Sequence, residues 1–192
     1  MKVRGIQMSV AECMVLGLLS QGYRYGHELD KVVEERRMRL WSKLTRETLY
    51  QALKRIEGKG WAVAATEKEG ERPSRTTYTL TEKGQQSLRD MVADGLASQE
   101  VTNFDICVYV GFLYLLEPQD AIAQLRNRRA SREAIVASIP ETWTAENLPF
   151  GKRMNSKLIK SYYQMEIDWI DDIISDLKNH VAESIRDTEA RQ

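Results

Sequence analysis

The chain has 192 residues, 42% of them hydrophobic, and its 28 basic and 28 acidic residues give a formal net charge of zero. This length suffices for one large domain or two small ones with a buried core, and no stretch approaches the ~18 apolar residues of a membrane-spanning helix. The N-terminus shows no secretory signal pattern, and Cys13 and Cys107 both lie in apolar helical patterns. We therefore expect a cytoplasmic protein with buried, reduced thiols.

The first helices of the chain are predicted from their caps and their periodicity. Ser9 and Glu12 form a capping-box pattern, and the helix that they open is expected to end before Gly22. A turn with the sequence QGYRYGHEL leads into a second helix, expected over about residues 26–37. Its apolar residues again recur at helical spacing.

A third helix is predicted from Thr45, its expected N-cap, to Gly58 and Gly60, which end it. One side of this helix is apolar, because four residues recur at spacings of three and four: Leu49, Ala52, Leu53 and Ile56. The other side carries hydroxyls, an amide and positive charge. Between positions 36 and 55 there are seven basic residues and one acidic residue.

The periodicity changes from helical to β-type after residue 60. Residues 61–67 and 76–81 are rich in Val, Thr, Tyr and Trp, and the polar segment between them contains Gly and Pro. This pattern predicts two strands joined by a hairpin tip. Thr81 is the expected N-cap of the next helix.

The second half of the chain is predicted to be entirely helical. An apolar helix is expected over residues 104–116, and Pro118 is expected to start another helix that runs to about Ile139. Residues 140–150 contain two prolines and are expected to form a loop, and a last long helix is predicted over roughly 152–184.

The order helix, helix, helix, hairpin, helix is typical of a winged helix-turn-helix. The predicted fold is therefore mostly α with a small β-hairpin: a winged helix over residues 1–95 and an all-α dimerisation domain, with a possible effector site, over 96–192. Residues 1–95 hold 17 Lys and Arg against 13 Asp and Glu, whereas residues 96–192 hold 11 against 15. The first half is the better candidate for a polyanionic partner.

A helix with one apolar and one cationic side suits the major groove of B-DNA. Arg46, Thr48 and Gln51 are candidates for reading base edges, since Gln pairs with adenine and Arg with guanine. Phosphate contacts are expected from other residues of the helix and its flank, which are Lys43, Tyr50, Lys54 and Arg55. Arg72 and Arg75 at the hairpin tip are expected to meet the DNA backbone or the minor groove.

Three segments resemble the PadR family of transcriptional regulators: SVAECMVLGLLSQGYRYGHEL, TLYQALKRIEGKGW and RTTYTLTEKG. They match the family's glycine-aromatic-glycine turn, its recognition helix and the segment after its wing, in order, over about residues 8–90. His27 departs from the family pattern, which more often has Tyr there. The resemblance implies a winged-helix repressor that dimerises through C-terminal helices and responds to a small molecule. It also marks Thr48 and Tyr50 as DNA-facing.

The last helix carries an apolar stripe that is wider than one neighbouring helix would cover, and we expect one side of it to hold a homodimer. The candidate dimerisation residues are Leu158, Tyr162, Trp169, Ile170, Ile173 and Leu177. The surplus of aromatic residues in this half suggests a small hydrophobic or aromatic effector. For Trp143 and Trp169, packing remains the alternative to a ligand pocket.

The sequence contains no nucleotide-binding glycine motif and no zinc-ligand spacing, so we expect neither an enzyme nor a bound cofactor. An acidic strip from Asp168 to Asp176 is interpreted as a solvated face, with a metal site or an acid/base pair as the alternative. The arginines of residues 126–132 are interpreted as solvated or salt-bridged, with a second basic DNA surface as the alternative. Two functions remain open. The first is a DNA-binding regulator acting on a palindromic operator, and the second is a winged-helix interaction module that does not bind DNA.

Overall fold

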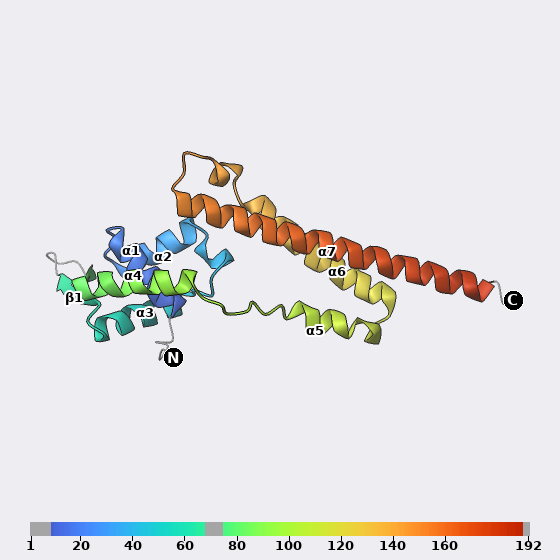
Figure 1. The fold of residues 1–192 in the computed structure, drawn as a ribbon, viewed down its shortest axis with the longest axis horizontal. Coiled ribbons are helices and arrows are strands. Elements are labelled where there is room, and N and C mark those ends of the chain that lie inside the picture. Colours follow the sequence, from blue (N-terminus) through green and yellow to red (C-terminus); the bar gives the residue numbers. More distant parts are fainter. Residues whose placement is uncertain (1–8, 68–74, 190–192) are drawn as a thin grey trace. The chain divides into compact units, whose positions relative to one another are not determined.

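The structure is a computed structural model that describes residues 9–67 and 75–189, with Thr144 and residues 181–189 described by their backbone alone. The chain divides into two compact units, Met1–Val101 and Thr102–Gln192. This division lies six residues beyond the predicted boundary at residue 95. Each unit is described by itself below (Figure 1).

Unit 1 contains the predicted order of elements, so the winged-helix prediction is confirmed. The elements are α1 Val10–Ser20, α2 Gly26–Glu35, η1 Met38–Leu40, α3 Arg46–Gly58, β1 Ala62–Glu67, β2 Arg75–Leu80 and α4 Glu82–Leu96. Fifteen of its described hydrophobic residues form one buried cluster, which includes the predicted stripe of α3: Leu49, Ala52, Leu53 and Ile56. Unit 1 therefore has a core of its own.

The caps of α3 and α4 follow the prediction. Thr45 accepts a hydrogen bond from the N–H of Thr48, and Thr81 accepts one from the N–H of Gly84. At the other end of α3, Gly60 has a φ of 68°, while the N–H of Trp61 donates to the carbonyl of Ile56. This is a Schellman motif, in which glycine supplies the left-handed conformation.

The capping box predicted at the start of α1 is wrong. Ser9 occupies the N-cap position without a side-chain hydrogen bond. The Glu12 side chain turns inward instead, where it is 2% exposed and binds two cations of the α3 region. The local pattern is overridden because two positive charges near a buried carboxylate stabilise it more than one backbone N–H does.

The wing is built on an antiparallel pair in which Ala62 lies opposite Leu80 and Glu67 opposite Arg75. The turn before α2 adds to this sheet, since Tyr25 bridges Thr77 and the carbonyl of Arg24 accepts from the N–H of Tyr78. This third segment ties the start of α2 to the wing. The predicted hairpin tip falls on residues 68–74, outside the described residues.

Unit 2 consists of α5 Ile106–Gly111, η2 Leu113–Leu115, α6 Pro118–Ser138, η3 Glu141–Thr144 and α7 Phe150–Glu189. The single helix predicted over residues 104–116 is wrong, because α5 ends at Gly111 and a separate 3-10 turn follows Phe112. None of the residues of α5 or η2 is buried within the chain. Cys107 is accordingly exposed, against the prediction of a buried thiol, whereas Cys13 is half-buried.

Helices α6 and α7 lie side by side over most of α6 (Figure 1). Their shared core is small, since the buried hydrophobic cluster between them has four of the described residues: Ile122, Leu125, Ile170 and Ile174. The boundaries predicted for α6 are confirmed, and α7 is longer at both ends than predicted. Among the described helices, none combines the length and apolar composition that a membrane span requires.

Candidate nucleic-acid interface

The two faces of α3 have opposite chemistry. Its four apolar residues have no exposed surface, whereas Arg46, Gln51 and Lys54 are exposed on the other side. Lys43, which precedes the helix, is exposed as well. The helix thus presents cationic and amide groups outward while its apolar face is held in the core of unit 1.

Two polar side chains of α3 already have partners within the helix. The Thr48 hydroxyl accepts from the N–H of Thr45 at 2.8 Å and donates to the carbonyl of Thr45 at 3.0 Å, which completes a reciprocal cap. Gln51 donates from Nε2 to Oε1 of Glu47 at 3.1 Å. Thr48 is therefore occupied in capping, while Gln51 makes a surface hydrogen bond that a base edge could replace.

Arg55 does not project freely from the exposed face. Its Nε donates to Oε1 of Glu12 at 2.7 Å, and Lys59 Nζ donates to Oε2 of the same carboxylate at 2.6 Å. The ammonium group of Lys59 also lies 4.4 Å from the ring centre of Trp61. These contacts fix the C-terminal half of α3 to α1, so Arg55 has a structural role, and its phosphate contact stays a prediction.

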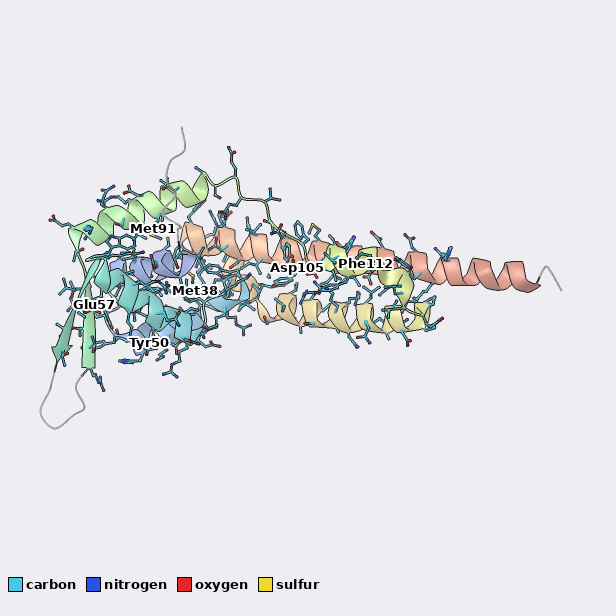
Figure 2. The ribbon with its side chains drawn as sticks, turned by 90° about the horizontal axis from the view of Figure 1, so that it is seen from below. Met38, Tyr50, Glu57, Met91, Asp105 and Phe112 are labelled. Carbon is cyan, nitrogen blue, oxygen red and sulfur yellow. The ribbon has the colours of Figure 1, made fainter. Side chains whose placement is uncertain are left out.

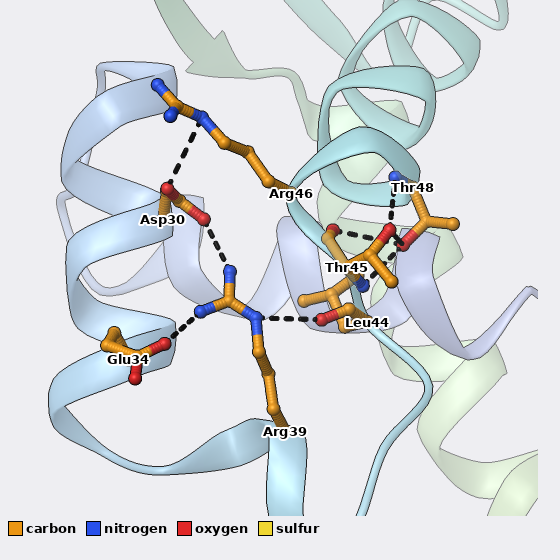
Figure 3. Close-up of polar contacts among 7 residues, drawn as sticks. All are labelled: Asp30, Glu34, Arg39, Leu44, Thr45, Arg46 and Thr48. Atoms are coloured by element: carbon orange, nitrogen blue, oxygen red, sulfur yellow. Dashed lines mark hydrogen bonds and ion pairs between the residues drawn. The ribbon is translucent and has the colours of Figure 1, made fainter.

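The N-terminal end of α3 is linked to α2 through a second set of charges (Figure 3). Arg39 donates to the carboxylates of Asp30 and Glu34, and its Nε donates to the carbonyl of Leu44 at 3.1 Å. Asp30 also forms an ion pair with Arg46, the first residue of α3, at 3.6 Å. Asp30 was not a predicted site residue, because no local pattern shows that this carboxylate faces α3.

Tyr50, labelled in Figure 2, is exposed, and its ring lies against Gly26 at the start of α2. A Cβ atom at Gly26 would lie only 2.7 Å from Cε1 of Tyr50, so the glycine leaves room for the ring. The glycine-aromatic-glycine pattern was visible in the sequence, but this role for Gly26 was not predicted. Gly26 lets the hydroxyl of Tyr50 stand at the junction of α2 and α3.

Tyrosines also mark the base of the wing. Tyr25 donates from its hydroxyl to Glu67 at 3.0 Å, and this hydrogen bond raises the pKa of Tyr25. Burial raises the pKa of Tyr78 on β2, with smaller effects from Glu57 and Tyr50.

Arg75 is exposed at the start of β2, whereas Arg72 lies outside the described residues. His27 is exposed, with its ring centre 5.5 Å from that of Tyr25.

The predicted dimerisation residues separate into two groups. Leu158 and Tyr162 are exposed on α7, and Met165 on the same side is exposed too. Ile170 is fully buried in the cluster between α6 and α7, and the remaining three pack partly against that cluster: Trp169, Ile173 and Leu177. We therefore reassign Ile170 to the core of unit 2.

Charged residues join the two long helices of unit 2. The carboxylate of Glu166, which is 5% exposed, accepts from Nε of Arg128 at 2.7 Å and Nε of Arg132 at 2.8 Å. Arg129 binds Asp171, and this hydrogen bond raises the pKa of Arg129. The salt-bridge interpretation of these arginines is confirmed.

Among the described residues, no group of three or more acidic, histidine or cysteine side chains is placed to hold a metal ion.

An open groove in unit 2 lies beside Trp169. It is lined by three apolar residues and five polar or charged ones: Val136, Met165, Trp169, Lys160, Ser161, Gln164, Asp168 and Asp172. The other tryptophan singled out by the sequence is already occupied, since the ammonium group of Lys152 lies 4.7 Å from the ring centre of Trp143. Trp169 is therefore the better placed of the two for a ligand.

The fold and this surface define a winged-helix protein with an exposed cationic helix. Residues 15–90 match the transcriptional regulator PadR-like family. The chain is 24% identical over 132 residues to the negative transcriptional regulator PadR of Bacillus subtilis, a match that covers 69% of this chain and 72% of that protein.

Solved structures of Bacillus subtilis PadR share the fold. The structure in complex with operator DNA has a TM-score of 0.75 at 20% identity, and the match covers 88% of this chain and 99% of that one. The structure in complex with p-coumaric acid has a TM-score of 0.69 at 19% identity, with the same coverage. Residues 15–90 thus match the PadR-like family of transcriptional regulators, and over most of the chain the fold is that of the solved PadR structures.

Proposed function

We propose that this protein is a sequence-specific DNA-binding repressor that inserts α3 into the major groove of its operator. The observation that carries the proposal is the division of α3 into a fully buried apolar face and an exposed face with Arg46, Gln51 and Lys54. A relative named as a negative regulator and a neighbouring structure solved with operator DNA support it. We expect it to act in the cytoplasm.

Within this proposal, the exposed residues differ in the part of the DNA that they contact. Arg46 and Gln51 are proposed to contact base edges, since guanidinium and amide groups can pair bidentately with guanine and adenine. Lys43, Tyr50, Lys54 and Arg75 are proposed to contact phosphates, which set the register of the protein on the duplex.

We propose that the protein acts as a homodimer through unit 2. The observation that supports this is the exposure of large apolar residues there, on and next to α5 and η2 and on one side of α7. They include Phe104, Val108, Tyr109, Phe112, Tyr114, Leu115, Leu158, Tyr162 and Met165, and Figure 2 shows Phe112 directly after α5. Exposed apolar surface of this extent is typical of interfaces. Two copies related by a two-fold axis would read a palindromic operator, with half-sites roughly 34–36 Å apart.

A small aromatic effector is proposed to control operator affinity. The groove beside Trp169 and a neighbouring structure with p-coumaric acid favour this. Such a ligand acts only if it binds the DNA-bound and DNA-free states with different affinity. Titration of Trp fluorescence with aromatic acids, followed by operator release, tests the proposal, and Trp169→Leu should remove the response.

The experiment that tests DNA recognition is selection of bound duplexes from random DNA, followed by binding titrations over a range of salt. Lys54→Ala should weaken binding to every sequence. It should also reduce the slope of log affinity against log salt concentration by about 0.9 for each subunit that loses a phosphate contact. Gln51→Ala should instead reduce the preference for one base pair per half-site by ~1–3 kcal/mol.

Lys31→Ala is the matched control, because Lys31 is an exposed lysine of unit 1 that pairs with Glu35 on α2. It should leave both the salt dependence and the preference unchanged. Equal affinity of the wild-type protein for selected and scrambled duplexes would refute the proposed function and favour an interaction module that does not bind DNA.

A further inference from the structure

The carboxylate of Asp30 on α2 stands between two arginines, with one oxygen for each. Oδ1 accepts from Nη2 of Arg39 at 2.6 Å, and Oδ2 forms the ion pair with Nε of Arg46 at 3.6 Å. The Asp30 side chain is about one-fifth exposed, at 22%. Figure 3 shows both arginines converging on this carboxylate from η1 and from the first residue of α3.

The two arginines differ in what remains available to a ligand. Arg39 is engaged through all three of its nitrogens, by Asp30, Glu34 and the carbonyl of Leu44. Arg46 has a side chain that is 72% exposed, and its ion pair uses the Nε edge. Figure 3 draws the contact of Arg46 with Asp30 from Nε alone and no contact from either terminal nitrogen. Arg46 therefore keeps the pair of donors that bidentate recognition requires.

We propose that Asp30 is a positioning residue that orients Arg46 for guanine recognition and restrains it from binding phosphate. The inference rests on the proposed function, in which α3 enters the major groove. Bidentate pairing of arginine with O6 and N7 of guanine needs both terminal nitrogens in one plane and one direction. A carboxylate on Nε limits the rotation of the guanidinium group, whereas a free arginine would follow the stronger field of the phosphates. Asp30 thereby raises sequence preference at the expense of general affinity.

The experiment compares the wild type with Asp30→Asn, Arg46→Ala and the double variant. The probes are a duplex selected with the wild-type protein, the same duplex with each G·C pair replaced, and a scrambled duplex. In Asp30→Asn, affinity for scrambled DNA should rise roughly two- to tenfold, because each freed Arg46 gains a phosphate contact and loses a weak surface ion pair. The slope of log affinity against log salt concentration should steepen by about 0.9 per subunit. Preference for the G·C pair read by Arg46 should fall roughly fivefold or more.

Glu34→Gln is the matched control. It removes the same charge from α2, but Glu34 contacts Arg39 and forms no ion pair with Arg46. It should leave the G·C preference unchanged. In the Arg46→Ala background, Asp30→Asn should also leave this preference unchanged, because the side chain through which Asp30 acts is gone.

An equal effect of Asp30→Asn with and without Arg46, or an equal effect of Glu34→Gln, would overturn the inference and leave only a general charge effect. Those results leave the proposed function intact, whereas a wild-type protein without preference for its selected duplex refutes the proposed function and this inference with it. Circular dichroism checks the fold of each variant. Asp30→Ser, which keeps an acceptor oxygen, replaces Asp30→Asn if that variant unfolds.

Discussion

Units 1 and 2 each hold one nearly buried glutamate between two cations, but the apolar surroundings differ. Glu12 binds Arg55 and Lys59 beside a cluster of fifteen buried hydrophobic residues. Glu166 binds Arg128 and Arg132 beside a cluster of four. Unit 2 also exposes a long series of large apolar side chains along α5, η2 and α7.

The difference indicates how each unit is stabilised. Unit 1 buries enough apolar surface to account for its fold, so its buried ion pair mainly fixes the orientation of α3. Unit 2 buries less within one chain and leaves apolar surface exposed, which is the pattern expected of a unit completed by a second copy. Basic residues that are alike in sequence thus differ in role: Arg55 and Lys59 bind an interior carboxylate, whereas we propose that Arg46 and Lys54 contact DNA.

The largest effect should come from placing a charge in the small core of unit 2. Ile170→Asp should destabilise unit 2 by ~3–5 kcal/mol, because an unpaired carboxylate would replace a fully buried side chain. Thermal unfolding followed by circular dichroism should then show loss of the α6–α7 helices while unit 1 stays folded.

Met165→Asp is the matched control on the exposed side of the same helix. It should keep the helical content but give a monomer in sedimentation, with specific DNA affinity lost because the second half-site no longer binds at high effective concentration. A folded and dimeric Met165→Asp variant would place the interface elsewhere, with α5 and η2 as the next candidate.

Replacing either buried glutamate should have an effect of intermediate size on stability, and the cost should differ between the two units. Glu166→Ala should cost ~3–5 kcal/mol, since it leaves Arg128 and Arg132, at 31% and 22% exposure, without their counter-charge. Glu12→Ala should cost less, roughly 1–3 kcal/mol, because Arg55 and Lys59 are 42% and 38% exposed and can return to water.

Denaturant unfolding measures both free energies. The surface pair of Arg129 and Glu133 supplies the control, for which Glu133→Ala should change stability by less than about 1 kcal/mol. An equal or larger cost for Glu12→Ala would show that the apolar core of unit 1 depends on its ion pair as much as unit 2 does.

The smallest effect should appear in the reactivity of the two cysteines. Burial raises the pKa of the half-buried Cys13 thiol, so less reactive thiolate is present at neutral pH, and alkylation of Cys13 should be slow in every variant. Cys107 is exposed within one chain but lies on α5, which we propose is covered in the dimer. Cys107 should therefore react faster in Met165→Asp than in the wild type, as followed by mass spectrometry.

The same shift sets the direction of a pH effect in unit 1. The folded state holds the Cys13 proton more tightly than the unfolded chain does, because the folded pKa is raised. Its contribution to stability is complete below the ordinary thiol pKa and is lost as the pH rises through the raised value. Cys13→Ser should remove this alkaline loss of stability.

For Cys107, alkylation at the same rate in the dimer and in the Met165→Asp monomer would show that α5 stays uncovered.

The sequence by itself determined the features that depend on neighbouring residues. The caps at Thr45 and Thr81, the buried stripe of α3 and the two strands of the wing were all predicted, because each arises within a few residues of chain. The winged-helix fold follows from the order of these elements. The length of α6 was likewise predicted from its initial proline and the break before residue 140.

The tertiary structure alone decided which charges meet. Glu12 lies 43 residues before Arg55, and Asp30 lies 16 before Arg46, so no local pattern identifies either pair. The same holds for Ile170, whose burial depends on α6, and for the interruption after Gly111, which separates α5, with no buried residue, from Leu113, which packs against the α6–α7 cluster. Periodicity gives the apolar face of a helix, but only the packed neighbours determine which polar residues remain free to bind a ligand.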